Sequence, residues 1–195
     1  MSAGRGSPRL ALFVYGSLVS ADSASATLER PVPAPVPARL PGWRRRWSQV
    51  RDNLAVEKTF ARRDNGEVPR HILGLTIEPS GEEGRAPNGA LIELSEEELL
   101  RLDVREMRYD RIEVAPIAGF DRVFAYRAKP AQRAPQPPPG AVVIAAYVAR
   151  VEAAFAALGN DQLRLYRETT GPPPVEVIDA VLVRDRIPPG NPRHW

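Results

Sequence analysis

The sequence contains no cysteine and only two histidines. Without a thiol the chain has no disulfide scaffold, no cysteine nucleophile and no cysteine-ligated zinc or iron–sulfur site. The two histidines, His71 and His194, are too few within one chain for a multi-histidine metal centre, and neither belongs to a recognisable catalytic triad. A carboxylate is therefore the leading candidate for a general base, and we expect neither a metal ion nor a cofactor.

Lysine is almost absent as well, because Lys58 and Lys129 are the only two and nearly all positive charge is arginine. The net charge is +3, and basic and acidic residues are interspersed along the chain, with one compact basic cluster at Arg44–Arg46. No run approaches the ~18 consecutive apolar residues of a membrane span, and the first eight residues lack the apolar core of a signal peptide. We therefore expect a cytoplasmic protein with neither a membrane nor a nucleic acid as its partner.

A chain of 195 residues with 43% hydrophobic residues has the size of one domain with a substantial core. Its 21 prolines and 14 glycines gather mainly in connectors such as residues 31–37 and 129–140. We expect a single domain over residues 1–195, loosely ordered at about residues 1–8 and 187–195.

The first informative stretch is an apolar strand, Leu10–Val14, that stops abruptly at Tyr15-Gly16-Ser17-Leu18. Gly16 allows a tight turn with no Cβ in the way of a ligand. Successive backbone N–H groups in such a turn can converge on a carboxylate or an oxyanion. Because most strand–glycine–serine junctions are only turns, this stretch alone is compatible with both an anion-binding loop and a simple connection.

The second informative stretch is an acidic helix followed by arginines. Ser95 and Glu98 have the spacing of a capping box, which predicts a helix start there, and we expect the helix to end near Asp103. Glu106 then lies just beyond it, in Leu102-Asp103-Val104-Arg105-Glu106.

The remaining pattern predicts a sheet of short strands and two further helices. Apolar runs bounded by turn residues indicate strands, and steps of three and four residues ending at Gly159-Asn160 indicate a long helix. The expected elements are strands from residue 40 onward and over 71–77, 89–94, 112–116 and 122–126, a long helix that includes Val143, Tyr147, Val151, Phe155 and Leu158, a short helix over 161–169 and an ambiguous apolar element over 175–183.

The order and spacing of the two stretches resemble the gamma-glutamylcyclotransferase-like superfamily, including its ChaC-like branch, over about residues 10–160. The matching motifs are the Tyr15-Gly16-Ser17-Leu18 loop and the LDxRE form that ends at Glu106. Met107 stands where relatives often carry glycine. The resemblance implies an α+β fold, a small and mostly antiparallel β-barrel with helices packed outside. It also implies an enzyme that cleaves a γ-glutamyl amide by intramolecular attack and releases 5-oxoproline and an amine or amino acid.

The resemblance further implies the roles of single residues. Glu106 matches the catalytic acid/base, and the substrate is a small γ-glutamyl compound. Tyr147 matches a substrate-contacting tyrosine that follows a proline-containing loop. The implied glutamyl pocket consists of Val14, Tyr15, Gly16, Ser17 and Leu18.

Alternatives to these roles stay open on the sequence alone. Glu106 is also compatible with a surface carboxylate paired with Arg105 or Arg108, and Tyr147 with a core aromatic. The substrate alternatives are glutathione, a γ-glutamyl amino acid, a γ-glutamyl-lysine and a γ-glutamyl biosynthetic intermediate.

Two other functional classes compete with the enzyme hypothesis. A non-catalytic relative would keep the fold and bind a small metabolite. A nucleic-acid-binding barrel would use Arg44–Arg46 together with Trp43 and Trp47 as a stacking platform.

Overall fold

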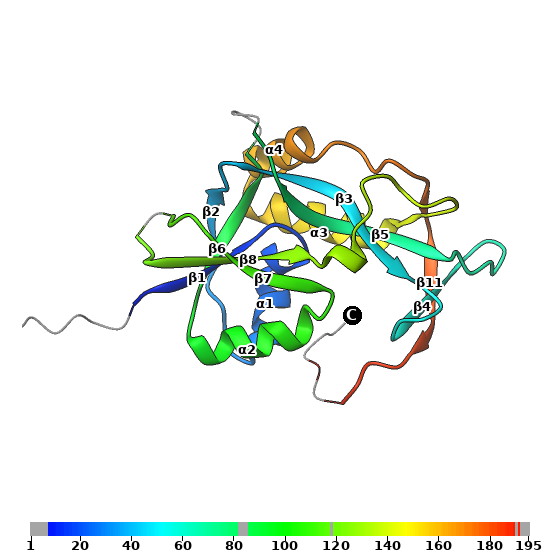
Figure 1. Ribbon diagram of the computed structural model, residues 1–195, viewed down its shortest axis with the longest axis horizontal. Coiled ribbons are helices and arrows are strands. Elements are labelled where there is room, and N and C mark those ends of the chain that lie inside the picture. The colour runs from blue at the N-terminus through cyan, green and yellow to red at the C-terminus, as the bar shows by residue number, and fades with distance from the viewer. Residues whose placement is uncertain (1–7, 82–85, 118, 190, 192–195) are drawn as a thin grey trace, which may run out of the picture.

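The computed structural model of the protein describes residues 8–81, 86–117, 119–189 and 191, and its elements are labelled in Figure 1. In chain order they are β1 (Leu10–Val14), η1 (Ser17–Val19), α1 (Ala21–Leu28), β2 (Val36–Arg39), β3 (Trp43–Asp52), β4 (Lys58–Arg62), β5 (His71–Pro79), β6 (Asn88–Leu94), α2 (Glu96–Arg105), β7 (Tyr109–Val114), β8 (Arg122–Ala128), η2 (Pro130–Gln132), β9 (Val143–Ile144), α3 (Ala145–Leu158), α4 (Asn160–Thr170), β10 (Val177–Ile178) and β11 (Ala180–Asp185).

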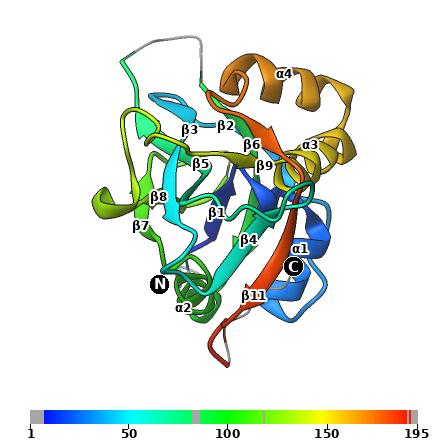
Figure 2. The same ribbon diagram turned by 90° about the vertical axis from the view of Figure 1, so that its right-hand side faces the viewer.

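The central element is β1, which lies in the middle of a five-stranded sheet of order β2-β6-β1-β8-β7. Its five residues are all buried, because strands flank it on both sides and helices cover the sheet (Figure 2). It pairs antiparallel with β6 and parallel with β8. The continuous apolar run of β1 is therefore that of a strand covered on both faces, and the α+β class is confirmed.

The predicted β-barrel, expected to be closed or partly closed, is not closed in the described residues, where the strands form the five-stranded sheet and three separate two-stranded sheets. The β3–β5 ribbon approaches the end of β8, but the Thr76 hydroxyl, rather than a backbone carbonyl, accepts the Ala128 amide at 2.8 Å. The Tyr109 hydroxyl likewise bonds the Leu75 carbonyl at 2.8 Å. A closed barrel would need backbone hydrogen bonds between the β3–β5 ribbon and the β7–β8 edge of the sheet. The hydrogen bonds found there involve side chains instead.

Other departures from the sequence prediction are local. The long helix begins at Ala145, because Val143 and Ile144 pair with Val177 and Ile178 as β9 and β10. The ambiguous apolar element over 175–183 resolves into β10 and β11, and β11 lies antiparallel to β4, an unpredicted strand. The expectation of loose ends falls largely on residues 1–7, 190 and 192–195, which lie outside the described residues.

Helix α2 positions Glu106, which follows its last residue. The predicted capping box is present, with the Ser95 side chain accepting from the Glu98 amide and the Glu98 side chain accepting from the Ser95 amide. The helix runs two residues beyond the predicted end and stops at Arg105, so Glu106 is its C-cap residue. Leu99 and Leu102 on the inner face of α2 are buried in the core.

We expect Ser95→Ala to lower the free energy of unfolding by about 1 kcal/mol, because the first turn of α2 loses the oxygen that caps it. Urea denaturation measures the change. Ser95→Thr keeps the capping oxygen and serves as the matched control. Equal loss in both variants would contradict the assignment of the effect to the cap.

Candidate active site

The loop after β1 is held by the side chains around it. The Tyr15 hydroxyl is buried and donates a 2.5 Å hydrogen bond to the Tyr126 carbonyl. Burial, and to a smaller extent the nearby Glu106 carboxylate, raises the pKa of Tyr15 well above its usual value, so this phenol stays neutral. Gly16 has φ −134°, outside the left-handed region, and its carbonyl accepts the Val19 amide at 3.0 Å. The turn therefore needs no left-handed glycine.

Arg45 clamps this loop from within the core. The side chain is 2% exposed, and its guanidinium donates to the Tyr15 carbonyl at 3.2 Å and the Asn88 carbonyl at 2.7 Å. It also lies over the rings of Phe155 and Tyr166, 5.0 and 4.5 Å from their centroids. Burial lowers the pKa of Arg45 to about 10, which still leaves it protonated at neutral pH. A buried cation thus fixes the residue immediately before Gly16.

Glu106 is turned inward at the end of α2, with its side chain 15% exposed. Its amide donates to the Leu102 carbonyl at 2.8 Å, and its carbonyl accepts the Tyr109 amide at 2.7 Å. One carboxylate oxygen accepts a 3.1 Å hydrogen bond from Arg105 Nε. The predicted alternative of pairing with Arg105 is therefore correct, but the predicted surface position is not.

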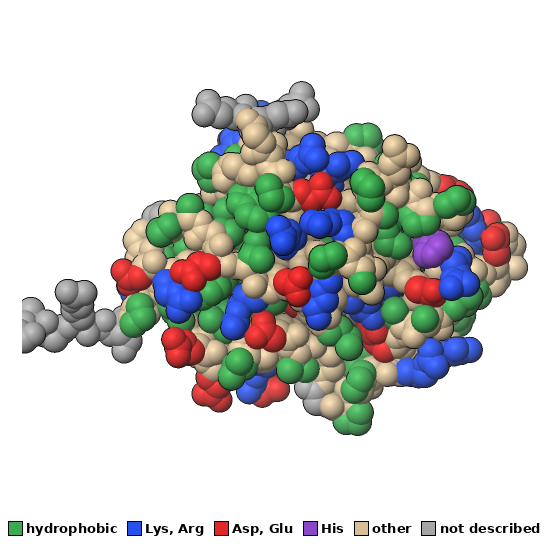
Figure 3. Space-filling view, viewed as in Figure 1, with side chains coloured by type: hydrophobic (Ala, Val, Ile, Leu, Met, Phe, Trp, Pro, Cys, Tyr) green, Lys and Arg blue, Asp and Glu red, His purple; other side chains and the backbone are tan. Residues whose placement is uncertain are grey.

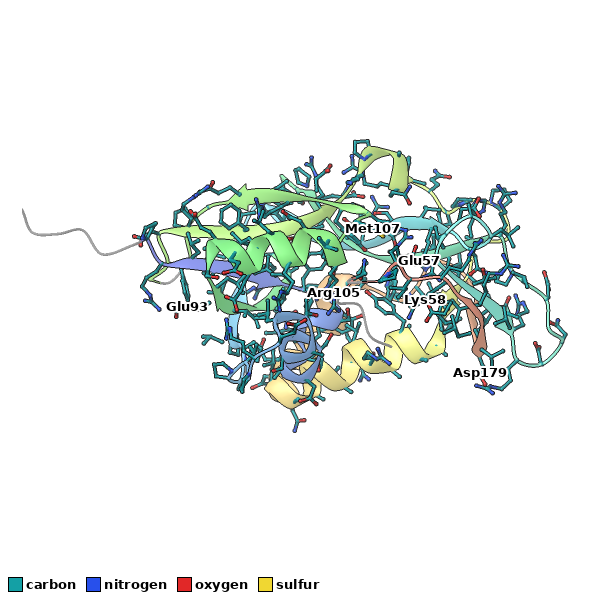
Figure 4. All side chains as sticks on the ribbon, turned by 90° about the horizontal axis from the view of Figure 1, so that it is seen from below. Glu57, Lys58, Glu93, Arg105, Met107 and Asp179 are labelled. Atoms are coloured by element: carbon teal, nitrogen blue, oxygen red, sulfur yellow. The ribbon has the colours of Figure 1, made fainter. Side chains whose placement is uncertain are left out.

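The charged groups around Glu106 have their own partners. Arg105 also donates to the Ser23 carbonyl at 3.2 Å, which ties the end of α2 to α1. Arg108 forms an ion pair with Glu57, and both side chains are about nine-tenths buried. Figure 4 shows Glu57 beyond the carboxyl end of α2, on the same side of the molecule as Arg105. Glu106 thus lies among arginines whose geometry is fixed by other contacts.

Two adjoining cavities meet at Glu106. The loop cavity, of about 70 Å³, is lined by Leu12–Leu18, Leu75, Glu106, Tyr109, Tyr126 and Tyr147. The basic cavity, of about 130 Å³, includes four arginines in its wall. Both walls contain Ser17, Glu106, Tyr109 and Tyr147. The structure therefore brings every predicted site residue, from Val14 to Leu18 and including Glu106 and Tyr147, to one cavity, while their chemical roles stay predictions.

Tyr147, in the first turn of α3, is both a packing residue and a cavity residue. Its ring contacts Trp47 edge to face, with centroids 6.1 Å apart. Burial is the main cause that raises the pKa of Tyr147, and the neighbouring Tyr166 and Glu106 add to it. A Cβ at Gly16 would lie 3.4 Å from the Tyr147 hydroxyl, so loop and hydroxyl are in close contact.

Several residues of the two walls are not among those predicted from the sequence. Tyr109, at the start of β7, belongs to both cavities, and its place three residues after Glu106 could have suggested it. Gln49 and Arg51 come from β3 and Arg150 from α3, and no local pattern singles them out. Met107, by contrast, is 42% exposed and belongs to neither wall.

Part of the surface required for nucleic-acid binding is buried, and its two more exposed arginines share one carboxylate. Trp47 is 6% exposed and Arg45 2%. Arg44 and Arg46 both lie 3.5 Å from the Glu78 carboxylate. On the face shown in Figure 3, basic and acidic side chains are interspersed. This arrangement argues against a stacking platform at β3.

The described residues contain neither a candidate membrane-spanning helix nor a cluster of metal-ligating side chains. No helix there is both long and apolar enough to cross a membrane. In the same part of the chain, no three histidine, aspartate or glutamate side chains lie close enough together to hold a metal ion.

Comparison with solved structures supports the fold. The crystal structure of YkqA from Bacillus subtilis superposes with a TM-score of 0.55 at 18% identity, over 83% of this chain and 54% of YkqA. This chain thus spans about half the length of YkqA, and the likeness is one of fold.

Two solution structures from Arabidopsis thaliana also match, At3g28950.1 at 25% identity and At5g39720.1 at 23%. They cover 65% and 68% of this chain, and this chain covers 66% and 79% of theirs. Their TM-scores of 0.38 and 0.39 are too low to support an argument. No protein-family model and no curated protein sequence matches the chain.

Proposed function

We propose that the protein is a gamma-glutamylcyclotransferase-like enzyme that converts a γ-glutamyl amide into 5-oxoproline and a free amine or amino acid. One observation carries the proposal: the carboxylate of Glu106 lies in the wall shared by two cavities, one of which is formed by the Tyr15–Leu18 loop. The residue types at these positions and their order along the chain are those on which the resemblance to the gamma-glutamylcyclotransferase-like superfamily rests. An intramolecular reaction of this kind requires no thiol, metal ion or cofactor.

The glutamyl part of the substrate occupies the loop cavity in this proposal. Ser17 begins the 3-10 turn η1, so the first amides of that turn have no partner within it and are available to an oxygen of the substrate. Tyr147 stays neutral because burial raises its pKa, and a neutral phenol can donate a hydrogen bond beside a carboxylate. The polar groups of this cavity thus suit the carboxylate and the developing oxyanion.

The chemistry is a ring closure within the substrate. Glu106 takes a proton from the substrate's α-ammonium, and the freed amine attacks the γ-carbonyl carbon, forming the five-membered ring. The bond from that carbon to the amide nitrogen then breaks as Glu106 returns the proton to the departing nitrogen. The ring nitrogen loses its second proton, and the released amine takes up a proton to become an ammonium. Holding the amine against the carbonyl raises its effective concentration, which reaches about 10⁵–10⁸ M in well-oriented intramolecular reactions.

The test is incubation of the protein with γ-glutamyl amino acids, γ-glutamyl amines and glutathione in ¹⁸O-labelled water, with product masses read against a protein-free control. We expect unlabelled 5-oxoproline, because the ring closes without water. Labelled glutamate would identify a hydrolase instead. Binding of these compounds without any product would favour the non-catalytic alternative.

We expect Gly16→Ala to reduce turnover more than stability. The added methyl meets the Tyr147 hydroxyl at 3.4 Å, beside the loop amides, whereas a φ of −134° imposes no left-handed strain on alanine. Turnover and the urea midpoint are measured on one preparation. Gly81→Ala is the matched control, because a Cβ at Gly81 meets nothing within 4 Å. Full activity of Gly16→Ala with a lowered midpoint would mean that the loop is only a structural turn.

A further inference from the structure

The segment after β11, the C-terminal strap, is attached to the chain that enters β4. The strap comprises residues 186–189 and 191 of the described chain. The Arg186 amide donates to the Glu57 carbonyl at 2.6 Å, and the Arg186 guanidinium donates to the Val56 carbonyl at 3.1 Å. Because β11 itself pairs with β4 (Figure 2), these two hydrogen bonds continue that pairing beyond the strand.

Further along, the strap reaches the end of α2. The side-chain amide of Asn191 donates a 3.0 Å hydrogen bond to the Val104 carbonyl. The last carbonyls of a helix have no amide partner within it, so a side-chain donor at this place caps the helix. The Asn191 backbone amide donates to the Pro188 carbonyl at 3.2 Å, which turns the strap at this point. Since Val104 comes two residues before Glu106, the cap acts on the turn that carries the carboxylate.

The other side of the same turn is held from β4. Arg108 comes two residues after Glu106, and its guanidinium donates to the Glu57 carboxylate at 3.0 Å in a buried ion pair. Glu57 thus bonds Arg108 through its side chain and Arg186 through its carbonyl. Residues 104–108 are therefore held at both ends by one connected unit, which consists of the start of β4 and the C-terminal strap.

The position of this turn matters for the proposed chemistry. Glu106 has to reach two nitrogen atoms of the substrate in succession, and a general base works only within hydrogen-bond reach of the proton it takes. Small displacements of a reacting group are costly in reactions that depend on orientation. Asn191 belongs to neither cavity wall, so its effect on catalysis has to pass through the turn.

We propose that Asn191 is a positioning residue of the active site. By capping the Val104 carbonyl it holds the end of α2, and with it the Glu106 carboxylate, in the place where ring closure needs a general base. This inference rests on the proposed function. It makes the C-terminal strap a working part of the site, although Asn191 lines neither cavity.

The first test is Asn191→Ala, which removes the donor. We expect kcat to fall by about three- to tenfold, the factor that one hydrogen bond is worth, while KM changes little because the cavity walls keep their residues. Asn191→Gln keeps an amide donor on a longer side chain and is expected to lose less. The urea midpoint is measured on the same preparations, so that the folded fraction is known.

Asn191→Asp gives a readout that a merely structural cap would not move. A carboxylate has nearly the shape of the amide but cannot donate, and it places negative charge at the end of α2, where the helix dipole is unfavourable for an anion. We expect kcat at neutral pH to fall below that of Asn191→Ala. We also expect the acid limb of the kcat profile to move to higher pH, because a negative charge near Glu106 favours the protonated form of that carboxylate.

The other groups around Glu106 do not titrate over the range of this profile or are the same in parent and variant. The arginines of the basic cavity stay protonated, and Glu57 keeps its ion pair with Arg108. Burial raises the pKa of each of the nearby phenols, so they stay neutral: Tyr15, Tyr126 and Tyr147. A shift of the profile therefore reports the charge introduced at position 191.

Asn65→Asp is the matched control. Asn65 lies in the turn after β4, belongs to neither cavity wall, and its side-chain oxygen accepts the Glu67 amide at 2.9 Å, as a carboxylate oxygen also can. The control makes the same change of charge and is expected to keep the parental kcat and pH profile. An equal shift in Asn65→Asp would contradict a role specific to Asn191.

The outcomes separate this inference from the function on which it rests. Parental kcat and an unmoved pH profile in Asn191→Ala and Asn191→Asp, with 5-oxoproline still formed, overturn the positioning role whatever the urea midpoint, and leave the cyclotransferase proposal standing. A raised KM at parental kcat also overturns it, because Asn191 would then act on substrate binding. No 5-oxoproline from the parent protein with any γ-glutamyl compound overturns both proposals together.

Discussion

Glu106→Gln is expected to lower kcat on a γ-glutamyl substrate by about 10²–10⁴-fold, the range associated with a positioned general acid–base. The amide has nearly the same shape as the carboxylate but cannot take the proton from the α-ammonium. Its carbonyl oxygen can still accept the hydrogen bond that Arg105 Nε donates at 3.1 Å, so the end of α2 keeps its geometry. We therefore expect KM and the urea midpoint to change little.

The control for this variant is Glu97→Gln, which removes a carboxylate from the exposed first turn of the same helix, away from both cavities. It is expected to keep parental turnover. Parental turnover in Glu106→Gln would show instead that this carboxylate is a structural partner of Arg105. A large loss of stability in Glu106→Gln would point the same way.

Arg45→Met is expected to lower the free energy of unfolding by about 2–5 kcal/mol, measured by urea denaturation. The buried carbonyls of Tyr15 and Asn88 lose the donor that Arg45 gives them, and an unsatisfied buried acceptor costs about 1–3 kcal/mol. The variant also loses the hydrogen bond to Tyr15, the residue before Gly16, so activity should fall by more than the unfolded fraction of the protein accounts for. Arg45→Lys keeps the positive charge but lacks the planar guanidinium, so we expect its free energy of unfolding to lie between those of the parent protein and Arg45→Met.

Arg44→Met is the matched control on the same strand. Arg44 is 45% exposed and shares Glu78 with Arg46 at 3.5 Å, a type of surface pair worth about 0–1 kcal/mol. If Arg44→Met and Arg45→Met lost similar amounts of unfolding free energy, the loss would come from placing methionine on this strand and not from removing the hydrogen bonds of Arg45. The clamp on the loop would then not be specific to Arg45.

Much of the candidate site could be predicted from local sequence patterns. The apolar run Leu10–Val14 is the central strand, and the Ser95–Glu98 capping box starts α2, since both signals involve residues only a few positions apart. The same pattern predicts that the helix ends near Asp103, with Glu106 just beyond it. In the structure the helix ends two residues later, at Arg105. Such short-range signals depend on neighbouring residues alone, so they can be recognised without the tertiary structure.

Long-range pairing was harder to predict. The pairing of Val143–Ile144 with Val177–Ile178 shortened the expected long helix, because a strand partner more than thirty residues away outweighed helical periodicity. The closed form of the expected barrel is absent from the described residues for a related reason. Closure depends on where the β3–β5 ribbon meets β8, and there the Thr76 hydroxyl, rather than a backbone carbonyl, accepts the Ala128 amide.

The sequence by itself determined the buried central strand, the loop after it, and a carboxylate at the end of an acidic helix, because each depends on spacing along the chain. Only the tertiary structure decided that Arg45 is a buried clamp whereas its neighbours Arg44 and Arg46 pair with Glu78. It alone joined Gln49 and Arg51 of β3 with Arg150 of α3 in one cavity. The physical reason is that burial and charge environment depend on residues brought together from distant segments, which no short pattern records.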